Sequence, residues 1–586
     1  MKKIKLFNLY DFIPRTVELF RKNKDGSPGY SLAGFGRDCA AGIVVGIVAL
    51  PLSMAFSIAA GGTPAQGIHT SIIAGFFISV LGGSRFQIGG PTGAFVVIIV
   101  NVIALHGISG LIAATVLAGI FLVLMGVFGL GRFIKYIPYP VTTGFTTGIG
   151  LLIFSQQVKD FFGLDIAKSP PDFISKWVEH FKAASSFEII TFAVGAGTLA
   201  IIILIRRFAP RIPGAACGVL IMTIATYLLK RLFHDYDVSG SGVDAVLVSQ
   251  IQQLDTIAAR FGGIPSSLPV PVIPPLSFEV FRDVFPAAFS IALLAAIESL
   301  LSAVVADGMS GDQHNSNTEL IAQGLGNIAS AVCGGIPATG AIARTAMNIK
   351  SGAVSPVAGI VNTVTLLLFV LFLAPSASAI PLASLSAVLI VVSWDMSNLS
   401  RFIRIIKTAP KSDVSVLIAT FMLTVLIDLS YAVVIGMLLA VFLFMRRMIE
   451  MASIRSENDE FIASLAYGGA ASAPEHNLAG LAPKDTEIFQ INGPFFFGVA
   501  DMLQGVLRQL SKTPKKIILR MDSVPAVDAT GIAALESFLM NCNKKGIRLI
   551  ITECGEQPKK AFLKAGFIEL LGHENFIESL EKAIEA

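Results

Sequence analysis

Long apolar segments dominate this chain and constrain its fold more than any other feature. An α-helix needs about 20 apolar residues to cross the hydrocarbon core of a bilayer. Fourteen candidate segments are present, at 39–60, 68–82, 92–106, 109–129, 141–158, 187–206, 214–232, 284–306, 319–334, 338–350, 353–374, 380–395, 412–430 and 431–447. The pattern predicts an α-helical polytopic membrane protein with fourteen transmembrane segments.

Composition supports a chain that lies mostly in lipid. Charged residues make up 14% of the 586 residues, whereas a soluble domain carries roughly 25%. The net charge of +4 gives no indication of nucleic-acid binding. The five cysteines form no CxxC pair or metal-like cluster, so we expect neither metal nor cofactor. The membrane part also lacks a nucleophile–base arrangement and a phosphate-loop motif, so an enzyme is not expected.

The basic residues predict how the segments are oriented. With the N-terminus inside, every even-numbered segment should end in the cytoplasm. The corresponding loops hold Arg85; Arg132 and Lys135; Arg206, Arg207 and Arg211; and Arg401, Arg404, Lys407 and Lys411. Lys230 and Arg231 go against this distribution. Because basic residues mark cytoplasmic loops, we expect a multi-pass protein of the inner cell membrane with both termini in the cytoplasm.

The membrane region divides into two halves. Residues 1–36 are expected to form a cytoplasmic N-terminal segment, and 37–450 the transmembrane domain. The polar stretch 233–283, rich in Gly, Ser and Pro, is predicted to be a long external loop. It separates repeats at about 37–232 and 284–450.

The C-terminal part has a different sequence pattern. Residues 451–484 are predicted to be a linker, and 485–586 a soluble domain. Short β-type runs, IFQI, KIILRM (516–521) and IRLIIT (547–552), alternate there with amphipathic stretches at 500–511 and 529–543. Strands that alternate with helices predict a small cytoplasmic α/β domain.

An internal repeat points to a binding site. GGPTGAF at 89–95 resembles GGIPATGAI at 334–342, and Thr92 and Thr339 lie 247 positions apart. This offset is close to half the membrane region, so we predict two seven-span repeats. Seven is odd, so the second copy enters from the opposite face and the repeats are inverted. Matching Gly and Pro interruptions mark the binding site in such transporters.

A helix that begins inside the membrane leaves backbone N–H groups unpaired. Such a start is tolerated only beside protein or a water-filled cavity, and its N–H groups attract an anion. Gly93 and Gly340 would let a ligand approach the backbone closely. The predicted anion site comprises Thr92, Gly93, Ala94, Phe95, Thr339, Gly340, Ala341, Ile342, Ala343 and Arg344. Alternatively, both motifs are turns whose glycines serve helix packing.

Glu298 and Arg344 lie deep in apolar segments, where ionisable residues are expensive and usually functional. We predict that they form a pair, in which Arg344 binds the anion and Glu298 competes for Arg344 unless it is protonated. That competition predicts proton–anion symport. Ser302 lies one turn beyond Glu298 and is expected to face the same cavity. The alternative is a purely structural ion pair.

The same offset of 247 places Pro51 opposite Glu298. A break of the first segment at Pro51 would aim Ser53, Met54 and Ser57 toward the cavity. Met54 is more often simple core packing.

The chain resembles the sulfate permease (SulP) family over nearly its whole length. The motifs that carry the resemblance are AGIVVGIVALPLSMAF, GGSRFQIGGPTGAF, AAIESLLSAVVADGMSGDQHNSNTELIAQGLGNI and GGIPATGAIARTAMNIKSG. The resemblance implies two inverted seven-span repeats, arranged as a core and a gate domain, with the anion between the starts of the third and tenth spans. The tail resembles the STAS domain of sulfate transporters and anti-sigma factor antagonists. The family implies a homodimer in the lipid bilayer, and a cytoplasmic protein partner for the tail.

Departures from the family pattern refine these expectations. The sodium-coupled bicarbonate branch has Asp, Thr and Thr where this chain has Glu298, Ser302 and Ile342, which argues against a sodium site. The pattern is more similar to the bacterial C4-dicarboxylate transporter. In the tail, the regulatory loop of anti-sigma antagonists corresponds to Asp528–Gly531. Ala529 replaces the phosphorylated Ser, so that switch is not expected; either Thr530 serves instead, or Asp528 and Thr530 cap the following helix.

The sequence therefore predicts a secondary active transporter of small anions, of the sulfate, bicarbonate or C4-dicarboxylate class. An anion exchanger, an anion channel and a membrane-anchored sensor that signals through the tail remain as alternatives.

Overall fold

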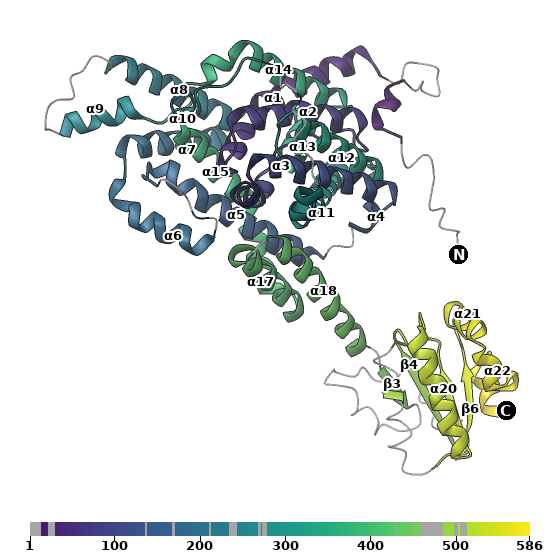
Figure 1. Ribbon diagram of the computed structural model, residues 1–586. Helices are drawn as coiled ribbons and strands as arrows, with labels where there is room; N and C mark the ends of the chain where they lie inside the picture. Colours follow the sequence, from purple (N-terminus) through teal and green to yellow (C-terminus); the bar gives the residue numbers. More distant parts are fainter. Residues whose placement is uncertain are drawn as a thin grey trace. The chain divides into compact units, whose positions relative to one another are not determined.

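The computed structural model describes residues 13–20, 30–134, 138–166, 170, 172–209, 212–233, 243–267, 271, 278–427, 429–451, 453–456, 485–496, 502–503 and 513–586. The chain forms two compact units, Met1–Met437 and Leu438–Ala586 (Figure 1).

The first unit is helical. Its first half contains η2 (Arg15–Phe20), α1 (Leu32–Ala59), α2 (Pro64–Leu81), η3 (Gly93–Phe95), α3 (Val96–Val127), α4 (Gly131–Ile134), α5 (Tyr139–Phe162), α6 (Phe173–Lys182), η4 (Ala183–Ser186), α7 (Ile189–Phe208) and α8 (Gly214–Leu232). Next come α9 (Val243–Gln253), α10 (Ile257–Phe261), α11 (Phe278–Ser310), α12 (Ser316–Val332), α13 (Ile342–Lys350), α14 (Val357–Ala377), α15 (Leu382–Ser397), α16 (Leu399–Thr408), α17 (Lys411–Leu426) and α18 (Leu429–Met451), which runs into the second unit.

Each of the fourteen predicted apolar segments overlaps a helix. Segments 92–106 and 109–129 both lie on η3 and α3, where Gly107 divides them with φ of 67°. Glycine adopts this left-handed conformation without steric cost. Nine helices in the described ranges are long and apolar enough to cross a membrane. The number of spans therefore remains a prediction.

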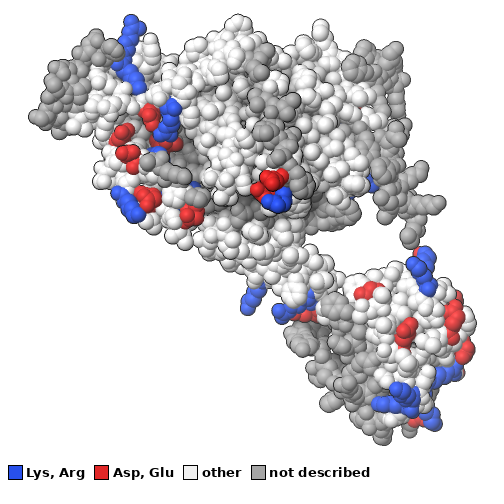
Figure 2. All heavy atoms as spheres, in the orientation of Figure 1, with Lys and Arg blue, Asp and Glu red and all other residues white. Residues whose placement is uncertain are grey.

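The surface of the first unit suits lipid. On the face shown in Figure 2 it is mostly free of charged side chains. Large apolar side chains are exposed on α7 and α8, among them Ile203, Leu204, Ile224 and Leu228. An exposed apolar surface of this kind would be a liability in water and is expected in a bilayer.

The prediction of an extended loop at 233–283 was wrong in part. α9 and α10 lie within it, and Ile251, Leu254 and Ile257 are buried. The backbone N–H of Ile257 donates to the carbonyl of Ile380, 3.0 Å away. The surrounding Gly, Ser and Pro residues concealed these short helices in the sequence.

The second unit contains the predicted α/β domain. Strands β3 (Ser453–Ser456), β4 (Thr486–Asn492), β5 (Lys516–Arg520), β6 (Arg548–Thr552) and β7 (Phe576–Ile577) form one sheet in that order. β3 is antiparallel to β4, and the other neighbours are parallel. The helices are α20 (Ala529–Lys544), α21 (Glu556–Ala565), α22 (Phe567–Leu571) and α23 (Leu580–Glu585), with η7 (His573–Asn575) before β7.

Alternation along the strands buries both faces of this sheet. Ile517 and Leu519 belong to a core with Phe538 of α20, while Ile518 packs with Leu580 of α23. Successive side chains of a strand point to opposite faces, which is why one strand contributes to both cores. The linker prediction was wrong at 453–456, because β3 pairs there with β4. Residues 457–484, and 500–511 apart from Met502 and Leu503, lie outside the described residues.

Glycines bring α3 and α12 into backbone contact. A Cβ atom on Gly119 would lie 2.7 Å from the carbonyl oxygen of Gly324, and one on Gly324 would lie 2.5 Å from that of Gly119. Reciprocal small residues of this kind allow close helix packing in membranes.

We predict that Gly119→Leu destabilises the folded protein by about 1–3 kcal/mol, because the side chain forces α3 and α12 apart. The midpoint of thermal unfolding in detergent should fall. Gly308→Leu is the matched control, since a Cβ there meets no atom within 4 Å. Equal midpoints for the two variants would contradict this account of the packing.

Candidate anion site

The two repeated motifs lie side by side. β1 (Gly89–Gly90) pairs antiparallel with β2 (Thr339–Gly340), with Gly89 opposite Gly340 and Gly90 opposite Thr339. The N–H of Ala341 extends the ladder by donating to the carbonyl of Ile88 at 2.9 Å. Directly after these strands, η3 begins at Gly93 and α13 begins at Ile342.

Both helices are short where they begin. α13 has 9 residues, which corresponds to about 14 Å, and α3 turns at Gly107 after 11 residues. Neither stretch matches the thickness of a bilayer core. That both helices begin inside the membrane stays a prediction.

Neither start is capped by a side chain. Thr92 precedes η3 and Ala341 precedes α13, and neither makes a capping hydrogen bond. Among the described residues, no hydrogen bond from the N–H groups of Gly93, Ala94, Ile342 or Ala343 is present. Free N–H groups at a helix start are anion-binding groups.

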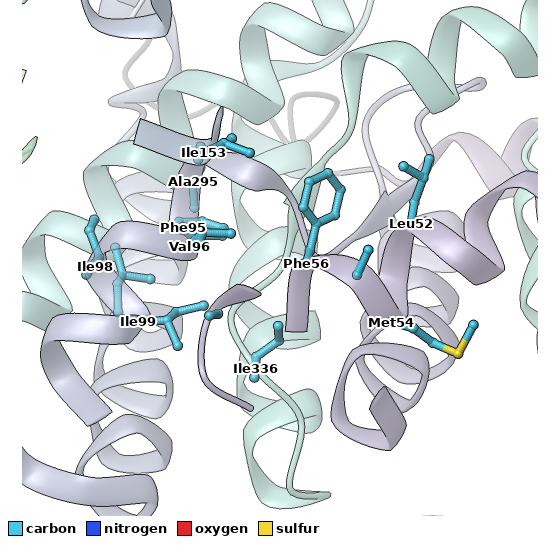
Figure 3. Close-up of a cluster of buried hydrophobic side chains, with 14 of the residues drawn as sticks. Leu52, Met54, Phe56, Phe95, Val96, Ile98, Ile99, Ile153, Ala295 and Ile336 are labelled. Carbon is cyan, nitrogen blue, oxygen red and sulfur yellow. The ribbon is translucent and has the colours of Figure 1, made fainter. Parts of the chain in front are cut away.

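The two starts differ in their accessibility. Ile342 is 41% exposed and Ala343 is also exposed, whereas Ala94 and Phe95 are fully buried. Figure 3 shows Phe95 and Val96 within a buried apolar cluster that includes Phe56 and Ala295. The start of α13 is thus the open side of the pair.

Arg344 of α13 lies next to β1. Its side chain is buried, at 2% exposure, and one guanidinium nitrogen donates to the carbonyl of Pro91. The other terminal nitrogen, Nη1, lies beside Gly90 and has no hydrogen-bond partner among the described residues; Ser71 also approaches Gly90 there. A buried cation without a counter-ion is costly, and a bound anion would reduce that cost.

Glu298 does not pair with Arg344. Among the described residues no ion pair joins them; the carboxylate of Glu298 instead accepts a hydrogen bond from Thr92 Oγ1 at 3.0 Å. The prediction of a direct pair was therefore wrong. Both residues contact the first repeat, at the adjacent positions Pro91 and Thr92.

The serines predicted on the first span face other protein groups. α1 continues through Pro51 without a break. Ser53 Oγ lies 2.6 Å from both the carbonyl of Ala49 and Ser71 Oγ, and Ser57 donates to the carbonyl of Thr63 at 2.7 Å. Proline is tolerated in membrane helices because neighbouring groups satisfy the freed backbone.

The remaining predicted residues fall into two groups. Met54 is fully buried in the apolar core, which agrees with its interpretation as a residue of simple core packing. Ser302 Oγ lies 3.1 Å from Thr345 Oγ1, which in turn accepts from the N–H of Ile88. Thr339 donates to the carbonyl of Ala295 at 3.0 Å. These hydrogen bonds thus connect the strand pair and the start of α13 to α11, which carries Ser302 and Ala295.

Protein side chains pack against the glycines of both motifs. A Cβ on Gly340 would lie 1.5 Å from Nε2 of Gln87, and one on Gly93 would lie 2.5 Å from Cδ1 of Ile153. Protein side chains thus already fill the space beside both glycines. The expectation that a ligand approaches the backbone at Gly93 and Gly340 stays a prediction.

Sequence reasoning missed two residues that shape the site. Gln87 donates to the carbonyl of Ser299 at 3.0 Å and so ties β1 to α11. Asn327 makes 2.8 Å hydrogen bonds to both the carbonyl and the N–H of Ala338, and so fixes the approach to β2. Both stand inside the motifs that carried the resemblance, but a polar residue in a motif does not reveal its partner.

In the tail, Asp528 caps α20. Its side chain accepts from the N–H of Gly531 at 2.7 Å, while Thr530 is exposed in the first turn. The capping interpretation thus holds for Asp528. A regulatory role for Thr530 stays a prediction.

Two helices broken at a shared strand pair, in a bundle with a lipid-compatible surface, define a membrane transporter built from inverted repeats. Comparison with known families narrows the class. Residues 35–420 match the sulfate permease family, and residues 482–583 match the STAS domain. The chain belongs to the sulfate permease family of anion transporters.

Known relatives cover almost the whole chain. The putative sulfate transporter YvdB of Bacillus subtilis is 39% identical over 94% of this chain and 97% of its own length. The bicarbonate transporter BicA of Picosynechococcus is 27% identical over 94% of each chain. Murine Slc26a9, an anion transporter solved in the inward-facing state, has a TM-score of 0.81 at 18% identity, covering 100% of this chain and 95% of that one, which shows a shared fold.

We predict that Gly340→Ala impairs transport, because the new methyl group displaces Gln87 and breaks its hydrogen bond to Ser299. Overpacking of this kind costs about 1–3 kcal/mol. Anion uptake into proteoliposomes measures the effect. Adding Gln87→Ala should restore part of the uptake, since it removes the clashing side chain. A double variant as inactive as Gly340→Ala would argue against this steric cause.

Proposed function

We propose that this protein is a proton-coupled symporter of small anions that works by alternating access. The anion is held between the starts of η3 and α13. Support comes chiefly from the buried Arg344, whose Nη1 lacks a partner among the described residues, next to two uncapped helix starts. Each of these features attracts negative charge.

Glu298 is proposed to couple the anion to the proton. When it is ionised, its negative charge near Thr92 opposes an anion at the start of η3. Protonation removes that repulsion, so proton and anion bind best together. The coupling then acts through the anion and Thr92, instead of through competition for Arg344. The proposed coupling predicts the direction of the pH dependence: uptake rises as the external pH falls.

The substrate class is proposed from the donors and the relatives. Backbone N–H groups and one guanidinium suit sulfate, bicarbonate or a C4-dicarboxylate equally. YvdB is described as a putative sulfate transporter and BicA as a bicarbonate transporter. YvdB shares more of its residues with this chain, so we place sulfate first.

The assembly and the tail complete the proposal. We infer a homodimer in the inner membrane with both termini in the cytoplasm. The STAS domain is proposed to bind a cytoplasmic protein partner and to regulate transport. A channel or an exchanger would use the same Arg344 without a coupled proton.

We expect Glu298→Gln to abolish the pH dependence of uptake while anion binding stays measurable, because Gln is neutral at every pH. Uptake of the radiolabelled anion into proteoliposomes, at an acidic and a neutral external pH, measures it. Glu279→Gln is the matched control, since Glu279 is an exposed carboxylate on the same helix. Persistent pH dependence in Glu298→Gln would remove Glu298 from the coupling.

One panel of uptake assays identifies the substrate and distinguishes a symporter from an exchanger or a channel. We expect saturable accumulation of radiolabelled sulfate, driven by an inward proton gradient and independent of internal anion. Bicarbonate and succinate are assayed in parallel and compete with sulfate if the site accepts them. Uptake that requires internal anion would identify an exchanger, and uncoupled conductance would identify a channel.

A further inference from the structure

α6 is an amphipathic helix whose faces are inverted relative to a helix in water. Its ten residues span about 15 Å, too short to cross a bilayer. Ile174, Val178 and Phe181 are exposed, at 64%, 46% and 75%. Lys176 and His180 are buried, at 3% and 4%. An apolar face turned outward fits a helix that lies against lipid.

A cavity of about 320 Å³ lies between α5 and α6. Its lining includes Val158 and Phe162 of α5 and Trp177 of α6. The indole N–H of Trp177 is already used, because it lies 3.1 Å from Ser155 Oγ. His180 also lines the cavity, and neither of its ring nitrogens has a hydrogen-bond partner among the described residues. The cavity thus combines apolar walls with one unsatisfied polar group.

Basic groups surround this unsatisfied histidine. The charges of Lys176 and Lys159 act on His180, and burial lowers the pKa of the imidazole below its usual value. Burial also lowers the pKa of Lys176 to about 8. Among the described residues Lys176 makes no ion pair, while Glu179 of the same helix pairs with the exposed Lys182 at 2.8 Å. The exposed carboxylate of Asp172 attracts this amine without a direct ion-pair contact, and a buried amine without a direct partner is costly.

We propose that this cavity binds a membrane phospholipid with an anionic headgroup. The phosphate lies at His180, near Lys176, and an acyl chain follows the apolar walls formed by Val158 and Phe162. Charge complementarity selects the headgroup, and the inverted face of α6 places the cavity at the lipid boundary. Free inorganic phosphate shares the headgroup chemistry, but it gains nothing from the apolar walls.

The two tryptophans of the chain allow a direct test. Trp177 lines the cavity, while Trp394 is 69% exposed on α15. With Trp394→Phe, the fluorescence of the full-length protein reports on Trp177 alone. The protein is reconstituted in phosphatidylcholine vesicles that contain increasing fractions of brominated phosphatidylglycerol or brominated phosphatidylcholine. Bromine quenches the indole on contact, so the ratio of apparent association constants measures headgroup preference.

We expect brominated phosphatidylglycerol to associate about fivefold more strongly than brominated phosphatidylcholine, the preference typical of one basic residue near a membrane. Lys176→Gln and His180→Gln should bring the ratio close to one, and Lys176→Arg should keep the preference. Lys182→Gln, which removes an exposed charge of the same helix, should leave it unchanged. Inorganic phosphate, against chloride at equal ionic strength, should not relieve the quenching.

Three results would overturn the proposal. The first is equal association of the two lipids with the parent protein. The second is a ratio that Lys176→Gln does not change although that variant still takes up anion. The third is relief of quenching by inorganic phosphate, which would assign the cavity to a free anion.

Discussion

A four-residue strand pair is the feature on which the proposed site depends. In lipid, an extended backbone must find partners for its N–H and C=O groups within the protein. Within the described part of the chain, Gly89 and Gly90 pair with Gly340 and Thr339 of the opposite repeat. Neither broken helix could persist alone, so the site exists only when both repeats have folded against each other. The ladder also fixes the distance between the two helix starts, because each follows its strand directly.

Much of this arrangement could be predicted from the sequence, since repeated Gly and Pro motifs and an odd number of apolar segments in each half already imply facing helix starts. The strand pairing could not, because two glycines carry no β-signature and their partner is distant in the chain. The neighbour of Gly340 could not be predicted for a similar reason: a glycine shows that space is needed, but not that Gln87 fills it. In the tail, short β-type runs predicted β4, β5 and β6, whereas β3 lies within the segment that was predicted to be a linker.

The charges are arranged more indirectly than an ion pair would suggest. Arg344 and Glu298 both belong to the second repeat, yet they hold adjacent residues of the first, through the carbonyl of Pro91 and the hydroxyl of Thr92. An anion at the start of η3 therefore meets a cation and a titratable carboxyl that share one backbone segment. Protonation and anion binding can influence each other through that segment without direct contact between the two side chains.

Selection among anions must then come from the surroundings of the helix starts. Backbone N–H groups supply positive potential but little preference of shape, so they accept many oxyanions. At the open side the exposed side chain of Ile342 adjoins the free N–H groups, and at the covered side Ile153 and Met396 approach Gly93. An apolar wall cannot replace the water around a larger or more highly charged anion. In the proposed site, the size and position of these three side chains would therefore set which anion loses the least hydration on binding, whereas Arg344 and the two helix starts would set only that an anion binds at all.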